Sequence, residues 1–307
     1  MRKTIMGMAA LLLSGAAQAH DPAPAPADGP APDVQPEMGA AANIDAAKTR
    51  AAAQLVRSGK TYRLGLVTGR DTPAYPPRSY DITVAPNDYP SPNDLTGHDD
   101  RVTTHFGIGT QIDGLAHIGR GGVHFGGLRA EDIFDAQGMK RLSASEIPVI
   151  ATRGVLIDMA RHFGVERLAP LKGFGEADIR AAAAAQGVSI GRGDVVLFHT
   201  GWLDMIGDAE NFLSRQPGLN VDGARYLASL GVVAVGSDTA ALETSQVTDG
   251  VLAPVHQVLL ADNGVFILES IDTRELAADE AGEFLFVLGA PRYEGSVQAI
   301  VNPVAIR

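Results

Sequence analysis

Short, continuous apolar runs alternate along most of the chain with stretches in which apolar residues recur every three or four positions. A continuous run predicts a strand buried on both faces, and the wider spacing predicts an amphipathic helix. Strands are therefore expected at 62–67, 154–159, 194–198, 232–235, 265–268, 283–288 and 298–301, and helices at 43–57, 176–186, 222–230 and 256–261. This alternation predicts one α/β domain, and the sequence shows no internal repeat.

The beginning of the chain has the pattern of a secretory signal peptide. Arg2 and Lys3 precede an apolar run that ends in Ala17-Gln18-Ala19, and small residues there are typical of a cleavage site. The apolar run is shorter than the roughly 20 residues that a membrane-spanning helix needs, and no later run reaches that length without charges. We expect residues 1–19 to be a signal peptide, and the protein to be exported, periplasmic or secreted, and soluble, with no membrane span.

Two polar segments interrupt the alternation of helices and strands. Residues 20–42 are rich in Ala and Pro and poor in large apolar side chains. Burial there cannot offset the entropy of ordering the chain, so the segment is expected to be a flexible tether before a domain at 43–307. Residues 70–101 are rich in Pro, Asp, Asn and Gly. They predict a long surface loop, of the kind that often borders a functional site.

Charge and cysteine content limit which binding partners and which kinds of catalytic or metal site are expected. The formal net charge is −11, and no basic stripe runs along the sequence. Nucleic acid is therefore excluded as a partner, and a small molecule is expected instead. The chain has no cysteine, which excludes disulfides, thiolate catalysis and cysteine-type zinc sites. Any metal must be held by His, Asp, Glu and neutral oxygen ligands.

Candidate chemistry is concentrated around Asp113 and His117, which stand four residues apart after a glycine-rich turn. The surrounding glycines favour a loop over a helix, and the spacing alone is better explained by a turn cap at Asp113 and a packed histidine at His117 than by a catalytic site. Far downstream, His256 and Glu269 bracket a strongly apolar run. A carboxylate at the end of a buried strand is costly unless it is protonated or paired, so a bound cation or a salt bridge is expected at Glu269.

These segments, in this order, resemble the metal-dependent cyclase family, which contains arylformamidases (kynurenine formamidases) and isatin hydrolases. The matching segments are Gly109-Thr110 with Asp113 and His117, then Arg153–Asp158, Gly193–Leu197 with Thr200–Trp202, Ser237–Thr239, and His256–Leu260 with Glu269. The resemblance extends from about Tyr62 to the C-terminus. It implies a single domain with a mixed β-sheet core and flanking helices, and it implies a homodimer.

The family signature is H-x-G-T-H-x-D-x-x-x-H, and the chain departs from it at two positions. Gly107 and Gln111 stand where the signature has its first and second histidines. Carried over by position, the resemblance implies that Asp113, His256 and Glu269 are metal ligands and that His117 is the catalytic acid and base. The position of a second metal has lost its histidines. One divalent ion, Mn²⁺ or Zn²⁺, is therefore expected.

Other residues near the signature are candidates for the site. Gln111 is a candidate metal ligand through its carbonyl oxygen. His105 lies two residues before Gly107, so on a strand it would face the same side and replace a lost ligand. The alternative for His105 is a packed or solvent-facing side chain. Thr110 is a candidate donor to a developing oxyanion.

Three aromatic residues, Phe106, Phe125 and Trp202, flank the signature segments and are candidates for the apolar wall of a substrate pocket. Core packing explains them equally well. The resemblance implies hydrolysis of a small non-peptide amide, either an aryl formamide or a cyclic amide such as an isatin-like ring, with a metal-bound water as nucleophile. Two alternatives stay open: a catalytically silent small-molecule-binding protein on the same scaffold, and a relative that opens lactones or dehydrates its substrate.

Overall fold

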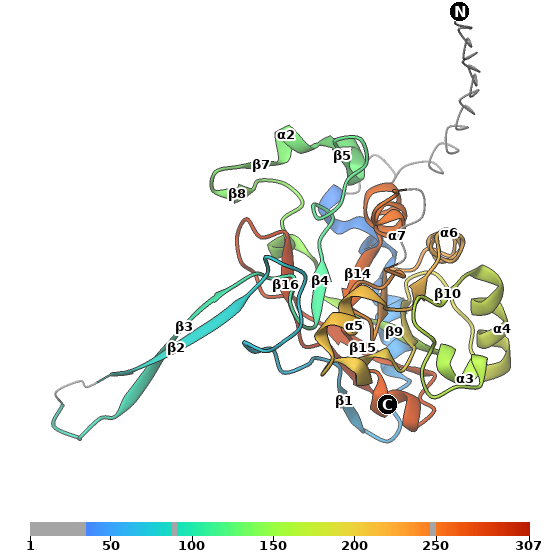
Figure 1. Cartoon of the computed structure of the whole chain (residues 1–307), viewed down its shortest axis with the longest axis horizontal. Helices are drawn as coiled ribbons and strands as arrows, with labels where there is room; N and C mark the ends of the chain where they lie inside the picture. The colour runs from blue at the N-terminus through green and yellow to red at the C-terminus, as the bar shows by residue number, and fades with distance from the viewer. Residues whose placement is uncertain (1–34, 88–90, 246–249) are drawn as a thin grey trace, which may run out of the picture.

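The centre of the molecule is a curled β-sheet. The computed structural model describes residues 35–87, 91–245 and 250–307, so the predicted signal peptide lies outside the described residues. Nine strands of the described residues form the sheet (Figure 1). In spatial order they are β1 (Thr61–Arg63), β17 (Val304–Ile306), β15 (Glu283–Leu288), β9 (Ile150–Asp158), β11 (Val195–His199), β13 (Ala234–Ser237), β14 (Phe266–Glu269), β4 (Gln111–Asp113) and β16 (Gln298–Ile300).

The sheet is mixed, with parallel strands in its middle and antiparallel strands toward both edges. β9, β11, β13 and β14 run parallel to their neighbours within this group, whereas β15 and β4 pair antiparallel on either side of it. Middle strands are covered on both faces, which is why Val195, Leu197 and Phe266 are fully buried and the sequence there is continuously apolar. The predicted single α/β domain with a mixed sheet is confirmed.

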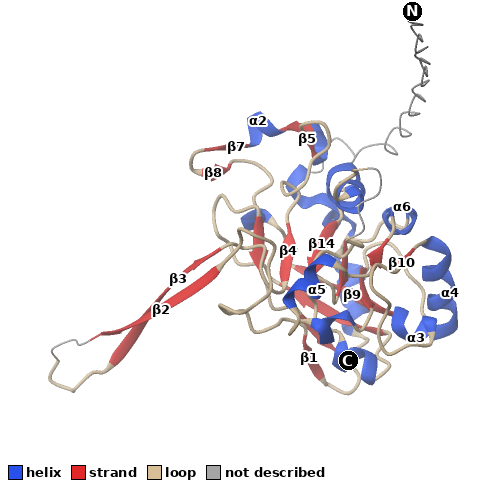
Figure 2. Cartoon of the chain, viewed as in Figure 1, coloured by secondary structure: helices blue, strands red, loops and turns tan. Residues whose placement is uncertain are grey.

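Helices surround this sheet (Figure 2). The α-helices are α1 (Ala46–Ala53), α2 (Ala130–Ile133), α3 (Met159–Phe163), α4 (Glu176–Gln186), α5 (Ala209–Ser214), α6 (Val221–Ser229), α7 (Pro254–His256) and α8 (Arg274–Ala278). Shorter 3₁₀ segments are η1 (Pro36–Asn43), η2 (Phe125–Gly127), η3 (Ala144–Glu146) and η4 (Trp202–Met205), and α7 continues into a π-helical stretch, η5 (Gln257–Asp262). In the described part of the chain, no helix is long and apolar enough to cross a membrane.

The predicted tether is wrong at its C-terminal end. η1 (Pro36–Asn43) packs against the core, with Ala40 and Ala41 buried. The backbone N–H of Ala40 donates to Gly264 O at 2.7 Å. Small residues allow this close approach of two backbones, so a composition poor in large apolar residues did not mean disorder here. The first helix is also shorter than expected, because Asp45, and not Asn43, caps it by accepting from Lys48 N.

The predicted surface loop at 70–101 contains a long hairpin instead. β2 (Tyr80–Asn87) and β3 (Gly97–Thr104) pair antiparallel from Tyr80 opposite Thr104 outward, and they extend away from the body as an arm (Figure 1). Most of the arm is exposed on both faces, so no apolar alternation marks it in the sequence. Backbone pairing, which has no sequence signature, holds the two strands together.

Short strand pairs complete the described structure. β5 (Val123–His124) pairs with β6 (Leu128–Arg129), β7 (Phe134–Asp135) with β8 (Gly138–Met139), and β10 (Gly173–Phe174) with β12 (Gly218–Leu219).

A buried ion pair ties two central strands together. Arg153 on β9 donates from Nε and Nη2 to the two oxygens of Asp194, at 3.0 and 2.6 Å, just before β11 begins. Asp194 is fully buried and also pairs with Lys48 of α1. Two segments that resemble the cyclase family therefore join the sheet to its covering helix, which is a structural role.

Candidate metal centre

Strand register places four polar side chains on one face of the sheet. Gln111 on β4 is directly opposite Glu269 on β14, and Asp113, two residues along β4, is directly opposite Gln298 on β16. Directly paired residues share a face, and so do residues two apart on one strand. All four side chains therefore project from the same side, at the end of the last parallel strand, where ligands of α/β sheets bind.

His256 reaches this face from the end of α7, at the point where the helix changes to its π-helical continuation. Its Nε2 lies 3.2 Å from Glu269 Oε1 and 3.5 Å from Asp113 Oδ2. One ligand atom from each of these three buried residues falls within 4.8 Å of the others. The three predicted metal ligands, separated by up to 156 positions in the sequence, therefore converge on one point.

Glu243 fixes the orientation of the His256 ring. Its Oε1 accepts from the backbone N–H of His256 at 3.1 Å and also bonds the ring Nδ1, while its Oε2 accepts from Val255 N at 3.1 Å. A carboxylate on the second ring nitrogen is the usual partner of a metal-bound histidine, because it sets the tautomer and raises the basicity of the ligating nitrogen. Nε2 is left to face Asp113 and Glu269.

The charges of the cluster favour a bound cation. Burial by itself would lower the pKa of His256, but hydrogen bonds with Asp113, Glu243 and Glu269 outweigh it and raise this pKa well above its ordinary value. Burial and the charge of Asp113 raise the pKa of Glu269 to about 7. Three carboxylates thus surround one imidazole, and a divalent ion would balance them while displacing the protons from His256 and Glu269.

One oxygen of the cluster has no hydrogen-bond partner. Asp113 is fully buried, and its Oδ2 accepts no hydrogen bond from the described residues; His256 Nε2 lies 3.5 Å from it, as an ion pair when the ring is protonated. Burial would raise the pKa of Asp113, but His117, His256 and Gln298 together lower it to about 2, so the carboxyl is ionised. A buried, ionised oxygen that accepts no hydrogen bond is costly without a cation beside it, which a protonated His256 or a bound metal ion would supply. The residues present therefore fit one divalent ion held by Asp113, His256 and Glu269.

Two glutamines bind the carboxylates of the cluster. Gln111 Nε2 donates to Glu269 Oε2 at 2.6 Å and to Asp113 Oδ1 at 3.3 Å, and Gln298 Nε2 donates to Asp113 Oδ1 at 2.6 Å. Gln111 is thus in the site as predicted, but its amide nitrogen and not its carbonyl oxygen faces the carboxylates. Ligation by Gln111 would require its amide to turn by a half-rotation.

His117 lies in the turn after β4, as the glycines predict, and its ring is centred 6.2 Å from the His256 ring. Burial lowers its pKa, and the charges of His256 and Arg78 lower it further against the opposing effect of Asp113. His117 is therefore neutral at pH 7 and able to accept a proton. This position suits a group that moves protons beside the centre without ligating an ion there.

His105 and Thr110 do not reach the cluster. His105 is exposed at the end of the arm's second strand, and its Nδ1 accepts from Ser79 N at 3.0 Å. The period-two expectation was wrong because the strand ends before His105 and the chain turns. Thr110 Oγ1 is fully buried and bridges two backbone segments, donating to Ser270 O at 2.6 Å and accepting from Leu66 N at 2.9 Å. The Thr110 hydroxyl therefore uses its hydrogen bonds to join two backbone segments.

The three aromatic candidates pack elsewhere. Phe106 stacks on Tyr293 with ring centroids 5.0 Å apart. Phe125 is buried against Gly264, where a Cβ would lie 2.6 Å from its ring. Trp202 is buried in a separate apolar cluster with Leu203 and Phe212. The packing explanation therefore fits their positions, since none of them lines the cavity beside His256.

That cavity opens next to the cluster, on the side of His256 and Glu243. Its volume is about 330 Å³. Most of its remaining lining is apolar or small, and includes Tyr75, Ala241, Val251, Leu252, Ala253 and Pro254. Small-molecule sites combine such an apolar wall with a few polar groups at one end.

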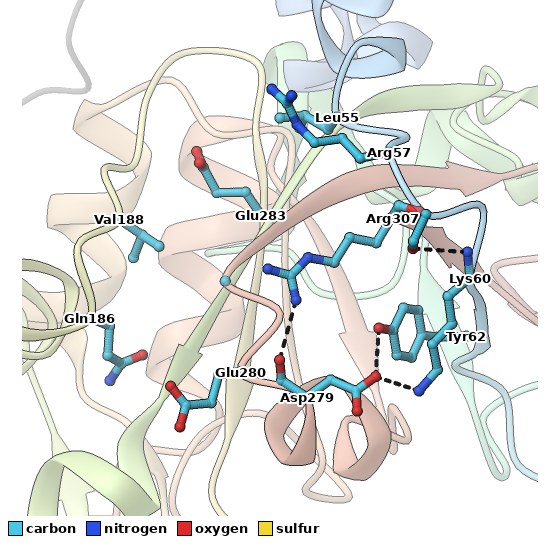
Figure 3. A pocket seen from close by; sticks show the side chains of 12 residues that line it. Leu55, Arg57, Lys60, Tyr62, Gln186, Val188, Asp279, Glu280, Glu283 and Arg307 are labelled. Carbon is cyan, nitrogen blue, oxygen red and sulfur yellow. Dashed lines mark hydrogen bonds and ion pairs between the residues drawn. The ribbon is translucent and has the colours of Figure 1, made fainter.

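A larger cavity, of about 710 Å³, lies away from the cluster (Figure 3). Several of its polar groups are paired with one another: Lys60 and Tyr62 both bond Asp279 Oδ2, and Arg307 Nη1 donates to Asp279 O. None of the predicted site residues lines it. Size therefore does not identify the functional site here, whereas the convergence of buried carboxylates on one imidazole does.

Sequence reasoning missed Glu243, Gln298 and Arg78, whose guanidinium lies beside the cluster. A signal for Glu243 existed, because a ligating histidine calls for a carboxylate on its second nitrogen, and Glu243 is an acid 13 positions before His256. Gln298 carried no such signal. It enters the site only because β16 pairs with β4 across 185 positions of sequence.

Comparison with known families agrees with this geometry. The family model described as "Putative cyclase" matches residues 62–244, which is more than half of the chain. The chain belongs to this cyclase family. The match begins at Tyr62, as the resemblance implied, but it ends at 244 and not at the C-terminus, so it includes Asp113, His117 and Glu243 but not His256 or Glu269. A comparison with curated protein sequences finds no match.

Solved structures of cyclase-family proteins share the fold. A "novel cyclase" is 27% identical with a TM-score of 0.81, over 88% of this chain and 96% of that one. An isatin hydrolase bound to the product analogue thioisatinate is 20% identical with a TM-score of 0.61, over 85% and 98%. A "predicted metal-dependent hydrolase" from Bacillus stearothermophilus is 20% identical with a TM-score of 0.55, over 80% and 97%.

Two further cyclase segments meet beside the centre. Asp238, after β13, is fully buried and accepts from Thr200 N at 3.0 Å and from the Thr200 hydroxyl, after β11. The backbone of Thr239 in turn accepts from Ser270 N at 2.8 Å, next to Glu269. These segments hold the ends of three parallel strands together, so their role is to position the strand end that carries Glu269.

Proposed function

We propose that this protein is an exported metal-dependent hydrolase of a small non-peptide amide, either an aryl formamide or a cyclic amide such as an isatin-like ring. The convergence of Asp113, His256 and Glu269, with one buried carboxylate oxygen that accepts no hydrogen bond, is the observation that carries the proposal. Its family membership and the metal-dependent and isatin hydrolases that share its fold support it. We also propose that it acts as a homodimer, in the periplasm or outside the cell.

The ligand set of one imidazole and two carboxylates suits Mn²⁺ or Zn²⁺. Such an ion, when bound, supplies a water of lowered pKa and polarises a carbonyl oxygen. The chain's own contribution begins with Glu243, which holds the His256 ring so that Nε2 points at the cluster. Gln298 donates to Oδ1 of Asp113, and Oδ2 is the oxygen that faces His256.

His117 moves the proton in this proposal. Because its pKa is lowered by burial and by nearby cations, its ring is neutral and accepts a proton from the attacking water. The same ring then donates that proton to the nitrogen that leaves as the C–N bond breaks. Once His117 has accepted the proton, the ionised Asp113 beside it stabilises the charged ring and so opposes the effect of burial.

The cavity suits a small molecule. Its volume of about 330 Å³ is enough for one or two rings, and its apolar wall suits an aryl group. Because Glu243 and His256 line the same cavity as Val251 and Leu252, an aryl ring bound on that wall would lie close to the cluster.

A catalytically silent binding protein is the second candidate, because Gln111 and Gln298 already give hydrogen bonds to the carboxylates of the predicted metal ligands.

Elemental analysis of protein purified without chelators distinguishes the hydrolase from the silent binding protein. It is paired with hydrolysis assays on formanilides, isatin-like rings and lactones, with His256→Ala as the site variant and the distant His162→Ala as its control. We expect stoichiometric metal in the wild type and the control, none in His256→Ala, and hydrolysis that follows metal content. Protein without metal, and with no rise in Tm on adding Mn²⁺ or Zn²⁺, would instead indicate the silent binder. Hydrolysis of lactones alone would indicate the lactone-opening alternative.

A further inference from the structure

An arginine guanidinium lies beside the metal cluster, on the side of Gly107. Arg78 precedes the arm and is half-buried, and its Nη1 donates to Gly107 O at 2.7 Å. Among the described residues this is the one hydrogen bond that its guanidinium makes, although the group carries five N–H donors. Several donors of a fixed cation are thus available next to Asp113, His256 and Glu269.

Gly107 makes room for this cation. A Cβ at position 107 would lie 2.6 Å from Arg78 Cζ and 2.8 Å from Gln298 Oε1, so no side chain fits there unless both neighbours move. Gln298 in turn donates to Asp113 Oδ1 at 2.6 Å. The guanidinium is therefore only one side chain removed from a predicted metal ligand. Gly107, which stands in place of the first signature histidine, therefore leaves the space that the Arg78 guanidinium occupies.

Electrostatic effects agree with this placement. Burial raises the pKa of Glu269 and of Tyr75, and the charge of Arg78 opposes that rise; burial lowers the pKa of His117, and the charge of Arg78 lowers it further. Tyr75 lines the cavity beside His256, and the backbone N–H of Arg78 donates to Tyr75 O at 3.0 Å, so the turn that carries the guanidinium borders the space where a ligand would bind.

A planar guanidinium with free donors matches the two oxygens of a carboxylate better than any other side chain. We propose that Arg78 binds the carboxylate of a ligand that occupies the cavity beside the cluster. In the context of the proposed function, that carboxylate is the one that opening a cyclic amide leaves on the aryl product, the formate released from an aryl formamide, or an acidic substituent of the substrate. The proposal concerns binding, so it is testable whether or not the amide reaction is found.

The experiment compares benzoate, an unreactive aryl carboxylate, with benzamide, its neutral counterpart, by calorimetry on protein purified without chelators. Arg78→Gln removes the charge, and Gly107→Ala keeps the charge but displaces the guanidinium. Arg70→Gln is the matched control, since Arg70 is exposed, lies in the same segment and pairs with Asp81.

We expect Arg78→Gln to weaken benzoate binding by roughly tenfold or more, as for loss of a charge-assisted hydrogen bond, and to leave benzamide binding unchanged. Gly107→Ala should weaken benzoate binding in the same direction, and Arg70→Gln should bind like the wild type. Benzoate affinity that is equal in the wild type and Arg78→Gln overturns the proposal. So does an equal loss for both ligands. If Arg78→Gln does not fold, Gly107→Ala decides by the same criteria. Failure of amide hydrolysis in the wild type leaves this comparison intact, so the two proposals fail separately.

Discussion

Glu243 holds His256 at two points, accepting from its backbone N–H at 3.1 Å and bonding its ring Nδ1. One carboxylate thus fixes both the helix end that carries the histidine and the rotation of the ring. The other ring nitrogen is directed at Asp113 and Glu269 as a result. Pre-orientation of this kind lowers the cost of binding an ion, because the ligand loses no further freedom.

Replacing Glu243 should therefore weaken metal binding without touching a ligand. For Glu243→Gln we expect metal affinity to fall by roughly tenfold to a hundredfold, since the amide no longer fixes the basic tautomer of His256. Metal titration by calorimetry measures this. Glu131→Gln, on an exposed residue, is the control and should bind metal like the wild type. Unchanged affinity in Glu243→Gln would show that the contact only caps the helix.

Metal affinity should rise with pH across neutrality. Glu269, whose pKa is raised to about 7, and His256, whose pKa is raised well above its ordinary value, must both lose protons when an ion binds. Below pH 7, each competing proton weakens binding by about tenfold per pH unit. Calorimetric titrations in buffers of different ionisation enthalpy would count the released protons. Affinity that is flat between about pH 5.5 and 7.5 would contradict these shifts.

The stability of the metal-free protein, in contrast to its metal affinity, should fall as pH rises. Glu269 keeps its proton in the folded state up to about pH 7 but loses it near 4.5 when unfolded, so the folded state binds more protons in between. Stability therefore falls as pH rises through this window, and the raised pKa of His256 extends the fall above 6.5. Urea unfolding with a chelator present, from about pH 5 to 8, measures it. Added metal should reverse the trend.

The strands of the sheet centre could be predicted from sequence, but the arm could not. Val195–Phe198 and Phe266–Leu268 are fully buried, so their apolar runs report their environment directly. The arm has the opposite environment, with Val84 and Val102 largely exposed, so its residue pattern resembles that of a loop. In the same way, η1 packs through Ala40 and Ala41, which are too small to register as core residues in the sequence.

The sequence indicated the predicted metal ligands of the candidate site but not the residues that hydrogen-bond to these ligands or lie beside them. Asp113, His256 and Glu269 followed from their match to a family signature. Gln298 and Arg78 reach the site through strand pairing across the sheet and through space left by a glycine, and neither is encoded locally. Aromatic residues near the signature, such as Phe106, were misleading because sequence adjacency does not determine which way a side chain points.

Removal of the proposed proton carrier should separate binding from turnover. His117→Ala is expected to retain its metal, because His117 is not among the three clustered ligands, but to lose about two to four decades of turnover. Elemental analysis and steady-state assays on the best substrate measure the two effects. His162→Ala, far from the cluster, should change neither. Full turnover in His117→Ala would assign proton transfer to another group.

The buried pair of Arg153 and Asp194 should matter for folding and not for metal binding. Arg153→Ala leaves Asp194, which is fully buried, with only Lys48 as a cationic partner. We expect a loss of about 3 kcal/mol in the free energy of unfolding, measured in urea. Arg161→Ala breaks an exposed pair with Glu280 and should cost less than about 1 kcal/mol. Equal effects of the two variants would mean that burial of Asp194 adds nothing.

Restoring both signature histidines should not restore a second metal. In Gly107→His with Gln111→His, a Cβ at position 107 meets Arg78 Cζ at 2.6 Å, and the guanidinium both blocks the new ring and repels a cation. We expect about one equivalent of metal per chain in this double variant, by elemental analysis. Adding Arg78→Ala frees the space and removes the charge, so the triple variant should hold about two. Two equivalents in the double variant would show that Arg78 moves aside readily. One equivalent in the triple variant would show that residues other than Arg78 and the two missing histidines also prevent binding of a second metal.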